Sequence, residues 1–261
     1  MKYEVARPSR SLLLLFHAYL YWYVGRHFRA LRAANAQRIP AEIHQAPQRV
    51  VVVLNHPSWW DPLTCMLLSR SLCRHGDHYA PMDATELRRY RLFLRMGLFP
   101  VEPASSRGAM QFLRAGAAIL SRPNSVLWVT PQGSFTDIRQ RPPALRSGVA
   151  SLILRSQPVT LLPLALEYVY WNERLPEILA NWGEPVLFKV PGDELGTIQS
   201  TIVSALATAQ DELASLAAAR DPLAFTTLLS GGRGMRSIYG LRLRTRGRKP
   251  ASDSARETRT R

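Results

Sequence analysis

The 261-residue sequence has only two cysteines, Cys65 and Cys73, and they form no Cys-x-x-Cys pair. Their spacing argues against a zinc site and provides no disulfide framework. We therefore expect two buried thiols in a reducing, cytoplasmic setting and no metal site.

A Gly-x-Ser-x-Gly sequence is also missing from the chain. This sequence positions the nucleophilic serine of α/β-hydrolases at a sharp strand-to-helix turn. Any group transfer is therefore expected to proceed by direct attack of a substrate hydroxyl.

The chain has no apolar run long enough to cross a membrane. Its N-terminal run, Ser11–Val24, has 14 residues, a helix of about 21 Å against a hydrocarbon core of about 30 Å. Tyr and Trp side chains in this run favour the headgroup boundary, and arginines flank it at both ends. We expect an in-plane or shallowly inserted anchor; a core helix is the alternative. A cleaved signal peptide would need a small-residue site, which does not follow.

Acidic residues are few: 19 Asp and Glu against 34 Lys and Arg, a net charge of +15. Residues 1–40 carry +6 and residues 231–261 carry +8, which leaves +1 for the 190 residues between them. Two basic ends on a nearly neutral body fit an anionic membrane surface better than a nucleic-acid-binding domain. Solvated tails without a partner are the alternative. We expect a membrane-associated protein at the cytoplasmic face, with membrane lipids and no nucleic acid as partners.

Apolar strands alternate with helical patterns along the rest of the chain. The runs 50–54, 125–129 and 159–166 predict buried strands, and 78–84 and 98–102 predict short ones. Helices are predicted over 62–72, from Thr85 to about Met96, from Ser105 or Ser106 to about Leu120, over 147–154 and over 197–220. This alternation predicts an α/β fold: a single domain with a largely parallel sheet flanked by helices. We expect an N-terminal membrane-associating helix in 1–40, the domain in 41–230 and a basic, flexible tail in 231–261.

Two polar segments directly follow buried strands: Asn55–Asp61 (NHPSWWD) and Pro131–Ser134 (PQGS). Sites in α/β sheets gather at the carboxyl ends of the strands, so both segments lie where a site is expected. A histidine is a suitable general base near neutral pH when a carboxylate holds one ring nitrogen. Asp61 could reach back to His56 across the turn. Such a pair alone is weak evidence, because it also occurs by chance.

The chain resembles the glycerolipid and lysophospholipid acyltransferase superfamily over roughly residues 40–220. Four ordered blocks carry the resemblance: Asn55–Asp61, the segment GLFPVEP from Gly97, the segment TPQGSFTD from Thr130, and the segment LLPLAL from Leu161. The third block is similar to the family's Phe-Pro-Glu-Gly-Thr-Arg-Ser.

The resemblance implies transfer of a fatty acyl group from acyl-CoA or acyl-carrier protein to a hydroxyl of a lysophospholipid. His56 would be the general base and Asp61 would orient it. Asn55, Pro131, Gln132, Gly133 and Ser134 would bind substrate or stabilise the oxyanion. No cofactor is implied, since the acyl thioester is a substrate. The oligomeric state is not indicated.

The sequence departs from the family where arginines are thought to hold the acceptor's phosphate. Pro103 and Phe135 stand near those positions, and Gln132 replaces a glutamate. Arg107 or Arg139 could substitute for the missing cations. The acceptor therefore stays open between a lysophosphatidate-like lipid and a non-phosphate lipid alcohol, glycosylated or isoprenoid. A non-catalytic membrane-binding relative is a further alternative, and a nucleic-acid-binding protein is another.

Overall fold

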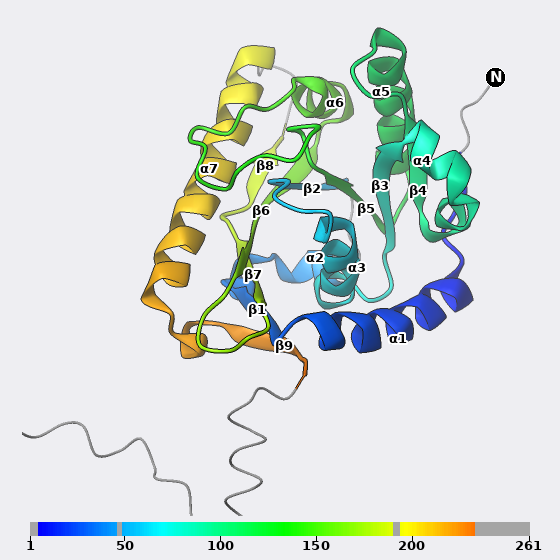
Figure 1. Ribbon diagram of the computed structural model, residues 1–261. Coiled ribbons are helices and arrows are strands. Elements are labelled where there is room, and N and C mark those ends of the chain that lie inside the picture. The colour runs from blue at the N-terminus through cyan, green and yellow to red at the C-terminus, as the bar shows by residue number, and fades with distance from the viewer. Residues whose placement is uncertain (1–4, 46–48, 190–193, 233–261) are drawn as a thin grey trace, which may run out of the picture.

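A nine-stranded mixed sheet runs through the structure, a computed structural model that describes residues 5–45, 49–189 and 194–232 (Figure 1). The strand order is β4-β3-β5-β2-β6-β7-β1-β9, and β8 pairs with β6. The strands are β1 (Ala30–Ala34), β2 (Val50–Leu54), β3 (Asp77–Asp83), β4 (Leu98–Val101), β5 (Ser125–Val129), β6 (Val159–Val169), β7 (Glu177–Trp182), β8 (Val186–Phe188) and β9 (Thr226–Ser230). Five of the described pairings are parallel and three antiparallel. The predicted α/β fold with a largely parallel sheet is confirmed.

Helices cover both faces of the sheet. They are α1 (Arg10–His27), α2 (Ala41–Gln45), α3 (Asp61–Leu72), α4 (Ala84–Arg89), α5 (Ser106–Leu120), α6 (Gly148–Ser156) and α7 (Leu195–Ala219), with short 3-10 turns η1 (Ala36–Arg38), η2 (Arg91–Met96) and η3 (Pro222–Ala224). In Figure 1, α1 runs along the bottom of the molecule beneath α3, while α5 and α6 lie at the top.

The central strand β2 shows how the sequence builds two cores. All five of its residues are buried. Val50, Val52 and Leu54 join a core with side chains of α1 and α3. Val51 and Val53 point to the other face and pack with α5, α6 and α7. An uninterrupted apolar run suits this strand because neither face meets water.

Four strands were not predicted from the sequence: β1, β7, β8 and β9. β1 lies between β7 and β9 in the sheet, although its residues fall within the predicted N-terminal segment 1–40. Its sequence, ALRAA, has small residues and an arginine in place of an apolar run. The sheet therefore extends beyond the expected domain start at residue 41.

The helix predicted from Thr85 to Met96 is interrupted. Asp83 is its N-cap and accepts a hydrogen bond from the backbone N–H of Thr85, so the helix begins at Ala84, one residue before the predicted start. The helix ends at Arg89, and a 3-10 turn continues to Met96. Gly97 ends that turn, with a φ of 97° that favours glycine.

The predicted N-terminal helix is present as α1. Its inner face buries Leu20 and Val24, while Leu15 and Trp22 are 72% and 57% exposed on its outer side. None of the helices in the described ranges is both long enough and apolar enough to cross a bilayer. Membrane anchoring by α1 stays a prediction. The predicted tail lies outside the described residues from residue 233 onward.

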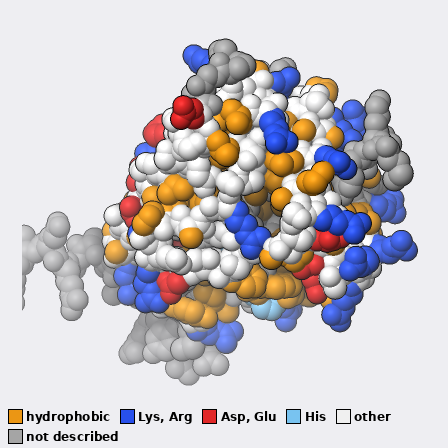
Figure 2. All heavy atoms as spheres, turned by 90° about the horizontal axis from the view of Figure 1, so that it is seen from above, with side chains coloured by type: hydrophobic (Ala, Val, Ile, Leu, Met, Phe, Trp, Pro, Cys, Tyr) orange, Lys and Arg blue, Asp and Glu red, His pale blue; other side chains and the backbone are white. Residues whose placement is uncertain are grey.

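Basic side chains are interspersed with other types on the face of the molecule seen from above. Figure 2 shows Lys and Arg side chains scattered among hydrophobic and acidic ones on the face seen from above. They form no continuous basic band across the described part of that face.

Candidate active site

The two polar segments meet because the strands before them are parallel neighbours. Val53 of β2 pairs with Val129 of β5, so the loops that follow leave the same edge of the sheet. The first loop carries His56 and leads into α3; the second begins with Thr130 and Pro131. The sheet thus brings together residues about 76 positions apart.

His56 and Asp61 form a hydrogen-bonded pair. The Nδ1 atom of His56 lies 2.6 Å from the Oδ2 atom of Asp61, and the Asp61 side chain is only 1% exposed. In the neutral ring this bond places the proton on Nδ1, because a carboxylate only accepts. The Nε2 atom has no hydrogen-bond partner within the described part of the chain. The ring therefore has one fixed nitrogen and one open nitrogen.

Three donors hold the Asp61 carboxylate in place. Besides His56, the backbone N–H of Ser58 donates to Oδ2 at 3.1 Å. The Tyr168 hydroxyl donates to Oδ1 at 2.7 Å. Burial and the charge of Asp61 raise the pKa of Tyr168 well above its ordinary value, so the phenol stays protonated and remains a donor. Asp61 also begins α3, where the positive end of the helix dipole stabilises a carboxylate.

The second loop holds the backbone of His56 from both sides. The Gln132 side-chain Oε1 accepts the backbone N–H of His56 at 2.6 Å. The backbone N–H of Thr136 donates to the carbonyl of His56 at 2.9 Å. Gln132 is 8% exposed, so this hydrogen bond of its side-chain oxygen is shielded from water. These two bonds set the position of the imidazole relative to the second loop.

Phe135 lies against the His56 ring. Its ring centroid is 4.6 Å from that of His56 at an angle of 51°, and Phe135 is 60% exposed. The surface beside His56 is therefore aromatic where the resemblance implied a cation.

An arginine absent from our sequence expectations lies next to Gly133. A Cβ atom at Gly133 would come within 2.7 Å of the Arg146 guanidinium carbon, and Gly133 has a φ of 71°, so both space and backbone favour glycine. The backbone N–H of Arg146 donates to the carbonyl of Pro131 at 2.9 Å. The guanidinium has no hydrogen bond or ion pair with any described residue. A free cation therefore lies beside the second loop.

The two arginines named as substitutes have partners of their own. Arg139 donates to both carboxylate oxygens of Asp137 at 2.9 and 2.6 Å. Arg107 lies 3.5 Å from Glu102. Of these three arginines, Arg146 is the one whose guanidinium has no partner among the described residues.

Asn55 is bonded to the sheet. Its side-chain oxygen accepts the backbone N–H of Leu166 at 2.8 Å, and its nitrogen donates to the carbonyl of Leu166 at 2.9 Å. These bonds continue the β2–β6 pairing by one residue and fix the start of the loop. Pro131 is buried, whereas Gly133 and Ser134 are exposed. Substrate binding by these residues stays a prediction.

The cysteines are not activated as nucleophiles. Burial and the nearby Asp61 charge raise the pKa of the Cys65 thiol well above its ordinary value, so it stays protonated and unreactive. Cys73 is buried. Within the described ranges, no group of three or more His, Cys, Asp or Glu side chains is placed to hold a metal ion.

Tyr168 and Arg146 were missed by reasoning from the sequence. Tyr168 is 107 residues from its partner Asp61, and only the pairing of β6 with β2 brings it near. Arg146 had a weak signal, since it follows the third block, but its neighbours carry no recognisable pattern.

The fold is similar to that of a solved enzyme, the 1-acyl-sn-glycerophosphate (LPA) acyltransferase PlsC from Thermotoga maritima. The two structures align with a TM-score of 0.47 and 14% sequence identity over 78% of each chain. No protein-family model matches the chain, and no curated protein matches it. A likeness this distant does not establish activity, so the function rests on the site itself.

Proposed function

We propose that this protein is an O-acyltransferase that moves a fatty acyl group from acyl-CoA or acyl-carrier protein to a hydroxyl of a membrane lipid. One observation carries the proposal: a buried carboxylate fixes one nitrogen of His56 and leaves the other open. This is the arrangement that a general base needs. The four sequence blocks, the lack of a Gly-x-Ser-x-Gly sequence and the raised pKa of Cys65 agree with it.

The reaction takes place in two balanced steps. His56 Nε2 takes the proton of the acceptor hydroxyl as its oxygen attacks the thioester carbonyl carbon. The tetrahedral intermediate then collapses, the C–S bond breaks, and the leaving thiolate takes the proton back from His56. The products are an ester and a free thiol. Asp61 stabilises the imidazolium that exists between the steps.

Donors for the oxyanion are available in the second loop. The backbone N–H groups of Gln132 and Ser134 donate to no described acceptor, whereas that of Gly133 donates to Thr130 at 3.1 Å. Backbone donors aimed at a developing negative charge lower the barrier to acyl transfer. No cofactor takes part in this scheme.

The acceptor of the leading proposal carries an anionic group, as a lysophosphatidate-like lipid does. Arg146 supports this choice because its guanidinium is free and lies against Gly133. A guanidinium fork binds phosphate through two parallel hydrogen bonds. Arg146 would thus replace the missing arginines of the second and third blocks.

Phe135 favours a second candidate, a non-phosphate lipid alcohol. An exposed aromatic ring against His56 offers stacking and apolar contact rather than charge. A sugar ring or an isoprenoid chain fits such a surface. The chemistry at His56 would be the same.

Labelled acyl transfer to a total lipid extract tests the function. The purified protein is supplied with labelled acyl-CoA or labelled acyl-carrier protein, and the labelled lipid is identified. An acidic phospholipid product supports the leading proposal, and a neutral lipid ester supports the second. No labelled lipid with either donor would contradict both.

A further inference from the structure

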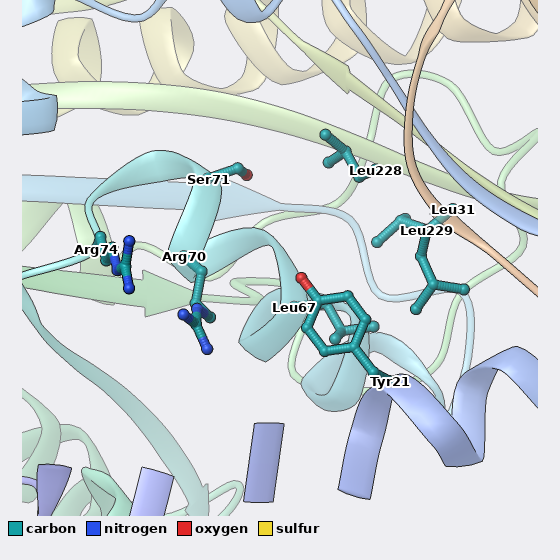
Figure 3. Close-up of a pocket in the computed structure, with 8 residues that line it drawn as sticks. All are labelled: Tyr21, Leu31, Leu67, Arg70, Ser71, Arg74, Leu228 and Leu229. Carbon is teal, nitrogen blue, oxygen red and sulfur yellow. The ribbon is translucent and has the colours of Figure 1, made fainter. Parts of the chain in front are cut away.

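A second basic site lies away from His56, in a pocket between α1, α3 and β9. The pocket has a volume of about 270 Å³. Its apolar wall is made by Leu31, Leu67, Leu228 and Leu229, which come from three elements. Figure 3 shows Arg70 and Arg74 at one end of the pocket, and Tyr21 and the leucines toward the other.

The two arginines have no counter-charge among the described residues. Neither Arg70 nor Arg74 makes an ion pair or a side-chain hydrogen bond with any described residue. No acidic side chain lines the pocket. Arg32, a neighbour in β1, is by contrast paired with Glu177. Two unneutralised cations at the rim of an apolar pocket favour a ligand that is anionic at one end and apolar at the other.

The position of the pocket indicates where such a ligand comes from. Tyr21 lines the pocket from α1, the helix that exposes Leu14, Leu15 and Trp22. Arg26 adds a cation on this helix, 5.2 Å above the Trp22 ring. An apolar helix face bordered by cations is complementary to an anionic leaflet. The pocket opens beside that face.

We propose that the pocket binds the headgroup of an anionic membrane phospholipid. Arg70 and Arg74 hold the phosphate, and the leucines contact the glycerol and the first methylenes of the acyl chains. The site is separate from the catalytic pair, and its binding is measured without turnover. It would give the protein a preference for anionic lipid beyond the general attraction of its basic residues.

Vesicle flotation of the full chain tests this site. The probes are phosphatidylcholine vesicles with and without phosphatidylglycerol, at equal total lipid. The variant Arg70→Gln/Arg74→Gln should lose about tenfold in partitioning to the anionic vesicles and keep its partitioning to phosphatidylcholine. The matched control is Arg114→Gln/Arg155→Gln, which removes two exposed arginines of α5 and α6 on the opposite side of the molecule (Figure 1).

A second variant and a competitor make the outcome decisive. Leu228→Glu places a carboxylate in the pocket and should abolish the anionic preference in the same way. An unchanged preference in both variants, or an equal loss in the control, would overturn the site. Release from anionic vesicles by inorganic phosphate, at a concentration where chloride of equal ionic strength has no effect, would show a free-phosphate site and overturn the lipid assignment.

Discussion

At the scale of single residues, the geometry of the site depends on the hydrogen bonds that the Asp61 carboxylate accepts. A buried carboxylate is costly unless it is hydrogen-bonded, and Asp61 accepts from Ser58, His56 and Tyr168. Each donor limits the positions that the carboxylate can take. Tyr168 is therefore a positioning residue that acts on His56 through Asp61.

Tyr168→Phe should lower kcat about tenfold, equivalent to about 1.4 kcal/mol, with little change in KM. The phenol contacts Asp61 and Thr64, not the open side of His56. Steady-state kinetics measure the split between kcat and KM. Tyr170→Phe is the matched control, since Tyr170 is 70% exposed two residues away. A raised KM with unchanged kcat would assign Tyr168 to substrate binding instead.

Arg146→Gln should raise KM for an acidic acceptor about tenfold or more, because a charge-assisted hydrogen bond contributes about 1.5–3 kcal/mol. Activity on a neutral lipid alcohol should not change. Arg155→Gln, an exposed arginine of α6, provides the control. Equal KM values for the acidic acceptor in Arg146→Gln and wild type would favour the second candidate.

Part of this site could be predicted from the sequence. His56, Asp61 and the second loop follow uninterrupted apolar runs, which signal buried parallel strands. Tyr168 and Arg146 belong to the site only through pairing and loop geometry, which a linear pattern does not contain. The bonds of the Asn55 amide to Leu166 also depend on strand pairing, and substrate binding by Asn55 stays a prediction.

At the scale of elements, α1 packs against Trp60 in the loop that leads from His56 to Asp61. The Trp60 ring lies 5.4 Å from His27 and 5.6 Å from Tyr23, centroid to centroid. Trp60 is the residue directly before Asp61. A helix expected to lie at the membrane surface is thus packed directly against the loop that carries His56.

β3 and β5 are joined by a partly buried polar contact that makes stability depend on pH. The Trp128 indole donates to Nδ1 of His78 at 3.0 Å, so Nε2 carries the proton and donates to the Cys73 carbonyl at 2.9 Å. Burial lowers the pKa of His78 to about 4. The unfolded chain, with a pKa of about 6.5, therefore binds more protons below neutral pH.

The contribution of this contact to the free energy of unfolding should accordingly be at its maximum above about pH 6.5 and decrease as the pH drops toward 4. For His78 the loss between pH 7 and pH 5 is about 1–2 kcal/mol. His17, whose pKa is also lowered to about 4, contributes with the same sign. Urea unfolding of wild type and His78→Gln at both pH values isolates the His78 share. An identical pH dependence in the two proteins would contradict it.

At the scale of the whole molecule, the place of β1 inside the sheet means that membrane association should not be tested by deleting the N-terminal segment. Deleting residues 1–40 would remove β1 from between β7 and β9 and so disrupt the fold. The strand β1 was not predicted from the sequence, because small residues and an arginine form no apolar run. Substitutions on the exposed side of α1 avoid the problem.

Leu15→Ser/Trp22→Ser should shift the protein from the membrane to the soluble fraction. Burying each of these side chains in a bilayer interface contributes about 1.5–3 kcal/mol, so partitioning should fall more than tenfold. Leu187→Ser/Leu223→Ser, which changes two residues that are 51% and 92% exposed elsewhere, is the control. Unchanged partitioning would show that another surface carries membrane binding.

The central claim is that His56 is the general base of acyl transfer. Its most direct test is the rate of labelled acyl transfer to lipid by His56→Ala, with thermal unfolding measured on the same sample. The proton-transfer role predicts a loss of about 10²–10⁴-fold with the unfolding temperature nearly unchanged, since the His56 side chain is partly exposed. A folded His56→Ala protein that transfers acyl groups at the wild-type rate would contradict the account.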